Sequence, residues 1–206
     1  MKVPAFEMPL EEIRASLDKL RRPLSIAVLR ARNPFNVGAI IRVAHSFLVR
    51  EIILVGSERY YERGAMGMDR YENIVCVADE AALIARVRAG GGKLVVFEKD
   101  VARVALWQAE LPAECTMVFG SEATGVPEEI VRAADMLVGI PMYGINHSFP
   151  VTVAAGIAMA EWTRRHYVNG PFPALPSDSD PLAPRASDPL APRASDPLAP
   201  RQRGEG

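Results

Sequence analysis

The chain has 206 residues, 49% of them hydrophobic and 24% charged, with a formal net charge of −1. It is long enough for one substantial core, and it has no apolar run near the roughly 20 residues that a membrane-spanning helix needs. The N-terminal segment also lacks an apolar signal core, so we expect a cytoplasmic protein without membrane contact. Cys76 and Cys115 lie in apolar runs without a CxxC pair, so we expect two buried, reduced thiols without a metal or redox role.

The charges are unevenly distributed along the chain. Residues 14–70 contain eleven Lys or Arg against five Asp or Glu, whereas residues 71–140 contain six against eleven. The basic part could face phosphate groups, but the same pattern fits charges that are only solvated. Composition alone leaves both interpretations open.

Residues 1–24 are predicted to form a helical extension. Apolar residues recur at three- and four-residue spacing from Leu10 to Leu20, which predicts an amphipathic helix that ends before Pro23. We expect this helix to pack on the sheet or on a second subunit. Its basic end, residues 19–22, could instead contact RNA.

Residues 25–168 are predicted to form one α/β domain, because short apolar runs alternate with helical patterns and imply a mostly parallel sheet flanked by helices. Small residues on the face of the last helix favour a dimer interface there. The predicted strands are 25–29, 51–55, 74–77, 93–97, 117–119 and 136–140, and the predicted helices are 40–47, 79–88, 101–107, one beginning at Pro127, and 151–167.

The segment 57–73 has the composition of a long functional loop, because it is polar and punctuated by glycine. Guanidinium groups and aromatic rings can bind the phosphates and unpaired bases of RNA, whereas the alternative is a loop whose tyrosines cover the core. The residues concerned are Arg59, Tyr60, Tyr61, Arg63, Arg70 and Tyr71.

Residues 169–206 have a different composition from the rest of the chain. The motif SDPLAPR recurs three times with a period of eight residues. Prolines at this density cannot sustain a helix or a central strand, and few large apolar residues are present to build a core. We therefore predict a disordered, proline-rich repeat tail.

Two of the predicted strands end in turn-forming residues that suit a ligand site. The strand 117–119 leads into Gly120 and Ser121, and the strand 136–140 leads into a segment with Pro141 and Gly144. In open α/β sheets, ligands bind at the carboxyl ends of the strands, where backbone groups are exposed. The sequence therefore predicts a small-molecule site here.

Three ordered motifs give this site a specific interpretation: NPFNVGAIIR at 33–42, FGSEATG at 119–125 and IPMYGINHSFPVTVAAGI at 140–157. Together they resemble the SpoU-type (TrmH-like) RNA 2'-O-ribose methyltransferases of the SPOUT superfamily, over residues 25–167. The resemblance implies a deep trefoil knot near the C-terminus, a homodimer, S-adenosylmethionine as methyl donor, no metal, and transfer to a ribose 2'-hydroxyl of tRNA or rRNA.

The resemblance also assigns roles to individual residues. Helical spacing alone favours a snorkelling Arg42 and a His45 that is a satisfied helix histidine rather than a base, whereas the resemblance makes Arg42 catalytic. The implied catalytic residues are Arg42, Asn36, Glu122 and Ser148; the implied donor-binding residues are Phe119, Gly120, Gly125, Ile140, Met142, Gly144 and Phe149; and the predicted RNA-binding residues are Arg32, Arg59, Arg63 and Arg70.

One position departs from the family pattern. Where the third motif of the family has asparagine, this chain has Pro150, which offers neither a side-chain amide nor a backbone N–H. Proline suits the start of the following helix, so the fold should survive. Asn146 or His147 could supply the lost hydrogen bond. Otherwise turnover is weak, or the protein is a catalytically impaired RNA-binding protein on the same scaffold.

Overall fold

The computed structural model describes residues 9–30, 33–56, 60–121, 124–145 and 147–167. Its centre is a seven-stranded sheet in the order β3-β2-β1-β6-β4-β7-β5, in which every neighbouring pair is parallel. The predicted parallel α/β fold is therefore confirmed. The strands are β1 (Arg22–Leu29), β2 (Val49–Val55), β3 (Ile74–Val77), β4 (Leu94–Phe97), β5 (Val104–Ala105), β6 (Cys115–Phe119) and β7 (Met136–Gly139).

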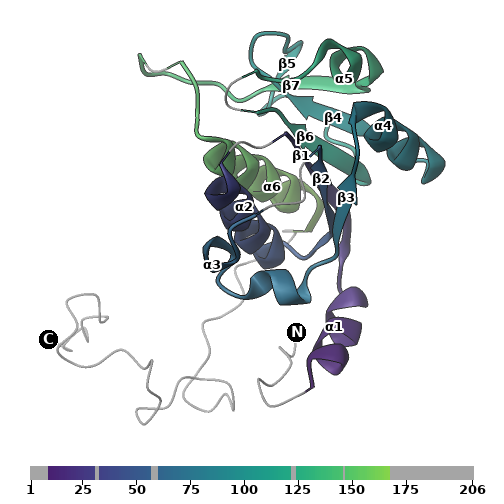
Figure 1. Cartoon of the computed structure of the whole chain (residues 1–206). Coiled ribbons are helices and arrows are strands. Elements are labelled where there is room, and N and C mark those ends of the chain that lie inside the picture. Colours follow the sequence, from purple (N-terminus) through teal and green to yellow (C-terminus); the bar gives the residue numbers. More distant parts are fainter. Residues whose placement is uncertain (1–8, 31–32, 57–59, 122–123, 146, 168–206) are drawn as a thin grey trace, which may run out of the picture. The chain divides into compact units, whose positions relative to one another are not determined.

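Helices cover both faces of the sheet, with α2 and α6 on one side and α4 on the other (Figure 1). This layering is what parallel strands require, because each crossover places a helix on a face. The helices are α1 (Leu10–Asp18), α2 (Pro34–Ser46), α3 (Glu62–Ala65), the 3-10 turn η1 (Met68–Tyr71), α4 (Glu80–Ala89), α5 (Glu128–Ala133) and α6 (Val151–Tyr167).

The strands divide their side chains between two hydrophobic cores. In β1, Ile26 and Val28 enter the core beneath α2 and α6, whereas Ala27 and Leu29 enter the core beneath α4 and α5. This alternation follows from the two-residue period of a strand. It explains why the strand sequences read as continuous apolar runs, since both faces are buried.

Two predictions about local structure were wrong. Residues 101–107 are not a helix: Val104 and Ala105 form β5, which pairs with the edge of β7. The open edge of the sheet offers backbone partners to this segment, and a seven-residue helix has little intrinsic stability. Cys76 is exposed rather than buried, because β3 is an edge strand, whereas Cys115 in the central strand β6 is buried as predicted.

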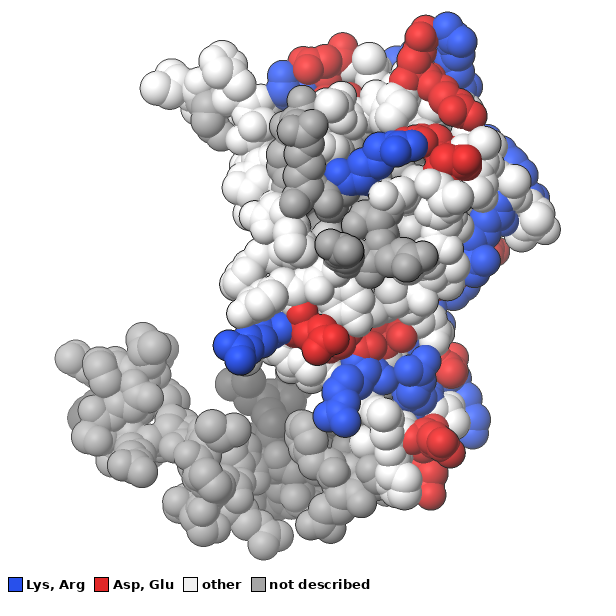
Figure 2. All heavy atoms as spheres, in the orientation of Figure 1, with Lys and Arg blue, Asp and Glu red and all other residues white. Residues whose placement is uncertain are grey.

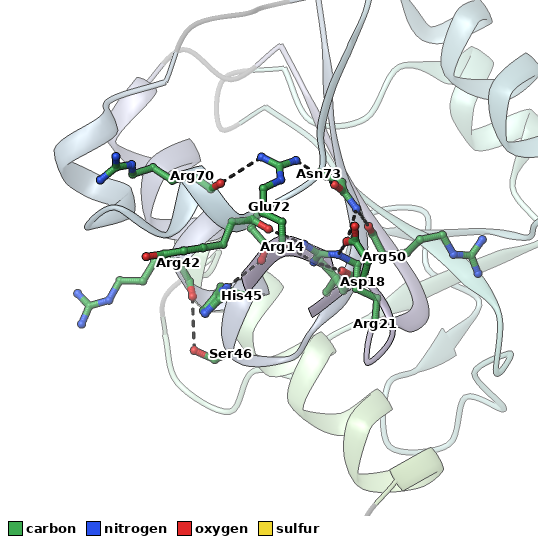
Figure 3. A network of polar contacts seen from close by, with 12 residues as sticks. Arg14, Asp18, Arg21, Arg42, His45, Ser46, Arg50, Arg70, Glu72 and Asn73 are labelled. Atoms are coloured by element: carbon green, nitrogen blue, oxygen red, sulfur yellow. Dashed lines mark hydrogen bonds and ion pairs between the residues drawn. The ribbon is translucent and has the colours of Figure 1, made fainter. Parts of the chain in front are cut away.

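Helix α1 contacts η1 and the residues just after it in its own chain, and its predicted contact with a second subunit stays a prediction. Arg14 donates hydrogen bonds to the carbonyl oxygen of Arg70 (3.1 Å) and to Oδ1 of Asn73 (3.3 Å). Figure 3 shows these residues at the edge of a larger polar network. The described part of the extension is thus held on the folded domain.

The basic end of this extension is also engaged in the fold. The Arg21 side chain is only 5% exposed and bonds to Glu72, while the Arg22 guanidinium lies 3.9 Å from the ring centroid of Tyr167 on α6. These contacts favour the structural interpretation of residues 19–22 over an RNA contact. The tail prediction for residues 169–206 lies outside the described residues. Residues 122–123 and 146, within the second and third motifs, also lie outside them, and the knot stays a prediction.

Candidate functional site

A cavity of about 740 Å³ opens at the carboxyl ends of β4, β6 and β7, where the sequence predicts a small-molecule site. Its volume falls in the range of roughly 300–1,000 Å³ that is typical of small-molecule sites. Of the predicted site residues, those that line it are Phe119, Gly120, Gly125, Ile140, Met142, Ser148 and Phe149.

The wall from the second motif depends on a tight backbone turn. After β6, Ser121 and Gly125 form an isolated bridge, with the amide of Gly125 donating to the carbonyl oxygen of Ser121 at 2.8 Å. A Cβ atom on Gly120 would lie 2.5 Å from the carbonyl carbon of Gly125, closer than such atoms approach in proteins. Glycine at position 120 is therefore required by the close packing of the turn.

The wall from the third motif leads directly into α6. Pro150 lines the cavity, and its carbonyl oxygen accepts the amides of Val153 (2.9 Å) and Ala154 (3.0 Å), the first hydrogen bonds of the helix. The prediction that proline suits this helix start is confirmed. Gly144 is not among the lining residues. It lies between Tyr143 and Ile145, whose large side chains are almost fully exposed.

A third wall was missed by sequence reasoning. Residues 98–101 follow β4, and all four line the cavity; among them, Lys99 is paired with Asp100 at 2.7 Å. An oxygen of Glu98 lies close to Gly125, at 2.8 Å from the place where a side chain on that glycine would begin. The strand β4 lies between β6 and β7 in the sheet, so its end must border any site formed by theirs. That order is the signal that the sequence alone does not provide.

The first motif begins α2 outside this cavity. The side chain of Asn33 caps the helix by accepting the amide of Phe35 (3.0 Å), and Pro34 occupies the first turn. Neither Asn36 nor Arg42 lines the cavity. Arg42 is exposed, and its side chain points away from the polar network (Figure 3). The described chain therefore does not bring Arg42 to the predicted donor site.

His45, one turn beyond Arg42, is a satisfied helix histidine, as predicted. Its Nδ1 lies 2.8 Å from Oε1 of Glu72, whose side chain is fully buried, and Glu72 also accepts a hydrogen bond from Arg21 at 2.8 Å. His45 lies on α2, Glu72 follows η1, and Arg21 belongs to the N-terminal extension. The cluster therefore joins α2 to the segment after η1 and to the extension.

Residues 60–73 of the predicted RNA-binding loop contain α3 and η1, helical turns that the composition does not predict. Arg63 and Arg70 are exposed, as an RNA contact requires. Tyr60 points inward: its hydroxyl donates to Asp69 at 3.2 Å, and burial together with Asp69 raises the pKa of Tyr60 to about 12. Glu122, Arg32 and Arg59 lie outside the described residues.

The surface seen in Figure 2 has Lys or Arg side chains interspersed with Asp or Glu, without a broad basic region. Within the described ranges, no helix is long and apolar enough to cross a membrane. In the same part of the chain, no three His, Cys, Asp or Glu side chains are grouped as metal ligands.

The SpoU rRNA methylase family model matches residues 23–160, two-thirds of the chain and all three motifs. The chain belongs to this family. The tRNA (guanosine(18)-2'-O)-methyltransferase of Aquifex aeolicus is 26% identical over 174 residues, which are 82% of each chain. The 23S rRNA (adenosine(1067)-2'-O)-methyltransferase of Streptomyces laurentii is 34% identical over 138 residues, covering 64% of this chain and 50% of that relative.

Solved structures agree with the SpoU assignment. The A. aeolicus TrmH/SpoU tRNA modifying enzyme superposes with a TM-score of 0.66 at 25% identity, covering 76% of this chain and 83% of that one. An AdoMet-bound rRNA methyltransferase from Sinorhizobium meliloti superposes with a TM-score of 0.64 at 28% identity, covering 73% and 60%. The mostly parallel sheet and the cavity described above thus belong to a SpoU domain.

Proposed function

We propose that this SpoU protein is an RNA methyltransferase that transfers a methyl group from S-adenosylmethionine to a ribose 2'-hydroxyl of tRNA or rRNA. The observation that carries the proposal is the cavity at the ends of β4, β6 and β7, which the second and third motifs line together. Relatives named as tRNA and rRNA 2'-O-methyltransferases, and a family structure with AdoMet bound, support it.

The lining residues fit a donor of this kind. Ile140, Met142 and Phe149 offer apolar surface, the turn at Gly120 exposes backbone groups, and Glu98 offers a negative charge to a cationic ligand. When bound, S-adenosylmethionine supplies a sulfonium methyl group that an oxygen nucleophile can attack. The residues lining the cavity would hold the donor in place, which would favour an alignment of its methyl group with the 2'-oxygen.

Arg42 is proposed to act through its fixed charge. A guanidinium keeps its proton in proteins, so a role as electrostatic clamp suits it better than a role as base. On this proposal it would bind the phosphate beside the target ribose or stabilise the developing alkoxide, while the 2'-hydroxyl would lose its proton to solvent and S-adenosylhomocysteine would be the leaving group. Asn36, Ser148 and Glu122 are proposed to shape the ribose site around it.

We also propose that the protein acts as a homodimer in the cytoplasm. Arg42 lies outside the residues that line the cavity, so the described chain does not by itself bring charge and donor together. A second copy can place an exposed α2 face beside the cavity of the first. The exposed Tyr143 and Ile145, next to that cavity, are apolar surface suited to such a contact.

The test is transfer of labelled methyl groups from S-adenosylmethionine to bulk tRNA and to ribosomal RNA, followed by mapping of the 2'-O-methylated nucleotide. Arg42→Ala should abolish transfer while donor binding, measured by calorimetry, stays within about threefold of the original. Arg132→Ala is the matched control, because Arg132 is an exposed arginine paired only with the exposed Glu128 in the described structure. Normal turnover by the Arg42 variant would remove this residue from the mechanism.

A second candidate function is RNA binding without catalysis. It is favoured by Pro150, which lines the cavity at the position where the family pattern has asparagine. A lost polar contact of this kind is worth about 1–3 kcal/mol, which slows transfer by about 5- to 150-fold. Pro150→Asn should therefore raise a weak activity by that factor. No gain in an active enzyme would mean that another residue makes the contact, and no transfer by either protein would favour the RNA-binding function.

A further inference from the structure

An exposed pair of stacked aromatic rings connects the start of α2, the helix that carries Arg42, with the residue that precedes α3. The rings of Phe35 and Tyr61 have centroids 5.0 Å apart and planes inclined by 22°. Their residues are 56% and 39% exposed, although rings of this size normally gain stability by burial. Tyr61 precedes α3 in the predicted RNA-binding loop, so the pair joins that loop to the first motif.

The backbone holds this pair in place. The amide of Tyr61 donates to the carbonyl oxygen of Pro34 at 2.9 Å. A Cβ on Gly38 would lie 2.4 Å from the carbonyl oxygen of Tyr61, and a Cβ on Gly64 would lie 3.2 Å from that of Phe35, so α2 and α3 touch through their backbones. The rings are therefore prearranged, which lowers the entropic cost of binding a flat ligand.

Charge beside the rings indicates which ligand. Arg42 is two helical turns beyond Phe35, at a spacing of seven residues that places both on one face of α2, and both are exposed. Arg63, two residues beyond Tyr61, is exposed on α3. A flat apolar surface with exposed arginines on the same two helices is complementary to an unpaired base and the phosphates next to it in the chain.

The other loop tyrosines do not share this arrangement. Tyr60 bonds to Asp69, and Tyr71 is only partly exposed, with its ring tilted against that of His45. These two fit the alternative in which loop tyrosines cover the core. Only Tyr61, of the three, lies in an exposed stack in the described structure.

We propose that Phe35 and Tyr61 form a stacking site for an unpaired RNA base next to the ribose that is methylated. The inference rests on the proposed function, because it takes Arg42 as the residue at that ribose. It implies that the substrate presents its target in a loop or single-stranded segment, since bases inside a helix are not free to stack on protein.

The test uses fluorescein-labelled oligo(A) and oligo(U) of twelve nucleotides and measures binding to the full chain by anisotropy over a range of salt concentrations. Phe35→Leu and Tyr61→Leu keep apolar volume but remove the flat rings. Each should weaken binding of oligo(A) by about 5- to 100-fold, with a smaller effect on oligo(U), because purines stack more strongly. Phe35→Trp should bind at least as well as the original.

Salt dependence separates stacking from charge. The leucine variants should keep the original slope of log affinity against log salt. Arg63→Ala should make this slope shallower, by the amount that about one phosphate contact contributes to it. Trp107→Leu is the matched control: Trp107 is 47% exposed but follows β5 at the edge of the sheet, and its loss should change nothing. An unchanged oligo(A) affinity in both leucine variants would overturn the proposal.

Two further measurements keep this result distinct from the proposed function. Light scattering after size exclusion gives the subunit number of each variant, and a change on Phe35→Leu would overturn the proposal by showing that the pair is a subunit contact. Methyl transfer to bulk tRNA is measured separately. RNA binding that depends on the rings, without methyl transfer, would support the stacking site and contradict the proposed function. Methyl transfer that is unchanged in both leucine variants would support the proposed function and contradict the stacking site.

Discussion

Glu72 offers a direct test of how the N-terminal extension is held on the domain. Its side chain is fully buried, and it accepts a hydrogen bond from Arg21, which is 5% exposed, at 2.8 Å. Removal of one partner from a buried ion pair typically costs about 3–5 kcal/mol, because the other charge stays buried without compensation. We therefore expect Glu72→Ala to destabilise the fold strongly.

The remaining partners of Arg21 place the loss at the lower end of that range. Arg21 keeps an ion pair with Asp18 at 2.7 Å and hydrogen bonds to the carbonyl oxygens of Val49 (2.9 Å) and Tyr71 (2.5 Å). We expect a loss of about 3 kcal/mol in the free energy of unfolding. For a domain of this size, that corresponds to a melting temperature lower by about 6–12 °C.

Urea denaturation followed by circular dichroism measures this loss. Glu128→Ala, which breaks the exposed pair with Arg132, is the control and should change stability by less than about 0.5 kcal/mol. The double variant Arg21→Met with Glu72→Leu should recover most of the loss, because a buried ion pair can be replaced by apolar side chains. A cost below about 1 kcal/mol for Glu72→Ala would refute the reasoning, since it would mean that Arg21 is solvated once its partner is gone.

Two further predictions concern the cavity wall and α6. Gly120→Ala should lower the affinity for S-adenosylmethionine by at least about tenfold in calorimetry, because the turn at Gly125 must move. The same variant should lose about 1–3 kcal/mol in the free energy of unfolding. Gly90→Ala is the control: its new Cβ would meet no atom closer than 3.6 Å, so it should change neither the affinity nor the stability. Hydrogen bonds from Arg164 and then Arg165 lower the pKa of Glu161 to about 2 from 4.5, so the stability they confer is present above about pH 4.5 and is lost as the pH falls towards 2. Denaturation curves at pH 6, 4 and 3 should show a smaller acid loss in Glu161→Gln than in the original protein, and equal losses would contradict this assignment.

Much of the fold could be predicted because the local sequence pattern of most helices and strands agrees with their place in the folded domain. The last helix, predicted at 151–167, has those bounds, and Asp79 caps α4 by accepting the amide of Ala82 at 2.8 Å. The segment 101–107 could not be predicted, because its two-residue strand forms only where the edge of β7 is open to it. Pairing of this kind depends on strand order, which hydrophobic periodicity does not report.

In the candidate site, too, some residues could be predicted from the sequence and others could not. Motif residues such as Phe119 and Ile140 line the cavity as predicted, since each motif continues a strand into a turn. Glu98 was missed because its strand contains no motif and borders the cavity only through its place between β6 and β7. Roles for Glu98 and Arg42 therefore depend on the three-dimensional arrangement, which for Arg42 includes the second copy that we propose.

The basic surplus of residues 14–70 contributes less to the surface than the sequence suggests. Arg14, Arg21 and Arg30 hydrogen-bond to groups of their own chain, and Arg30 forms a two-point pair with Glu80. An arginine that is already paired within its own chain is less available for a phosphate contact, and each phosphate contact contributes separately to RNA binding. Contacts that do not depend on salt can then supply part of the affinity. An exposed, prearranged aromatic pair beside Arg42 is suited to that role, and it would direct the protein towards unpaired nucleotides rather than towards RNA in general.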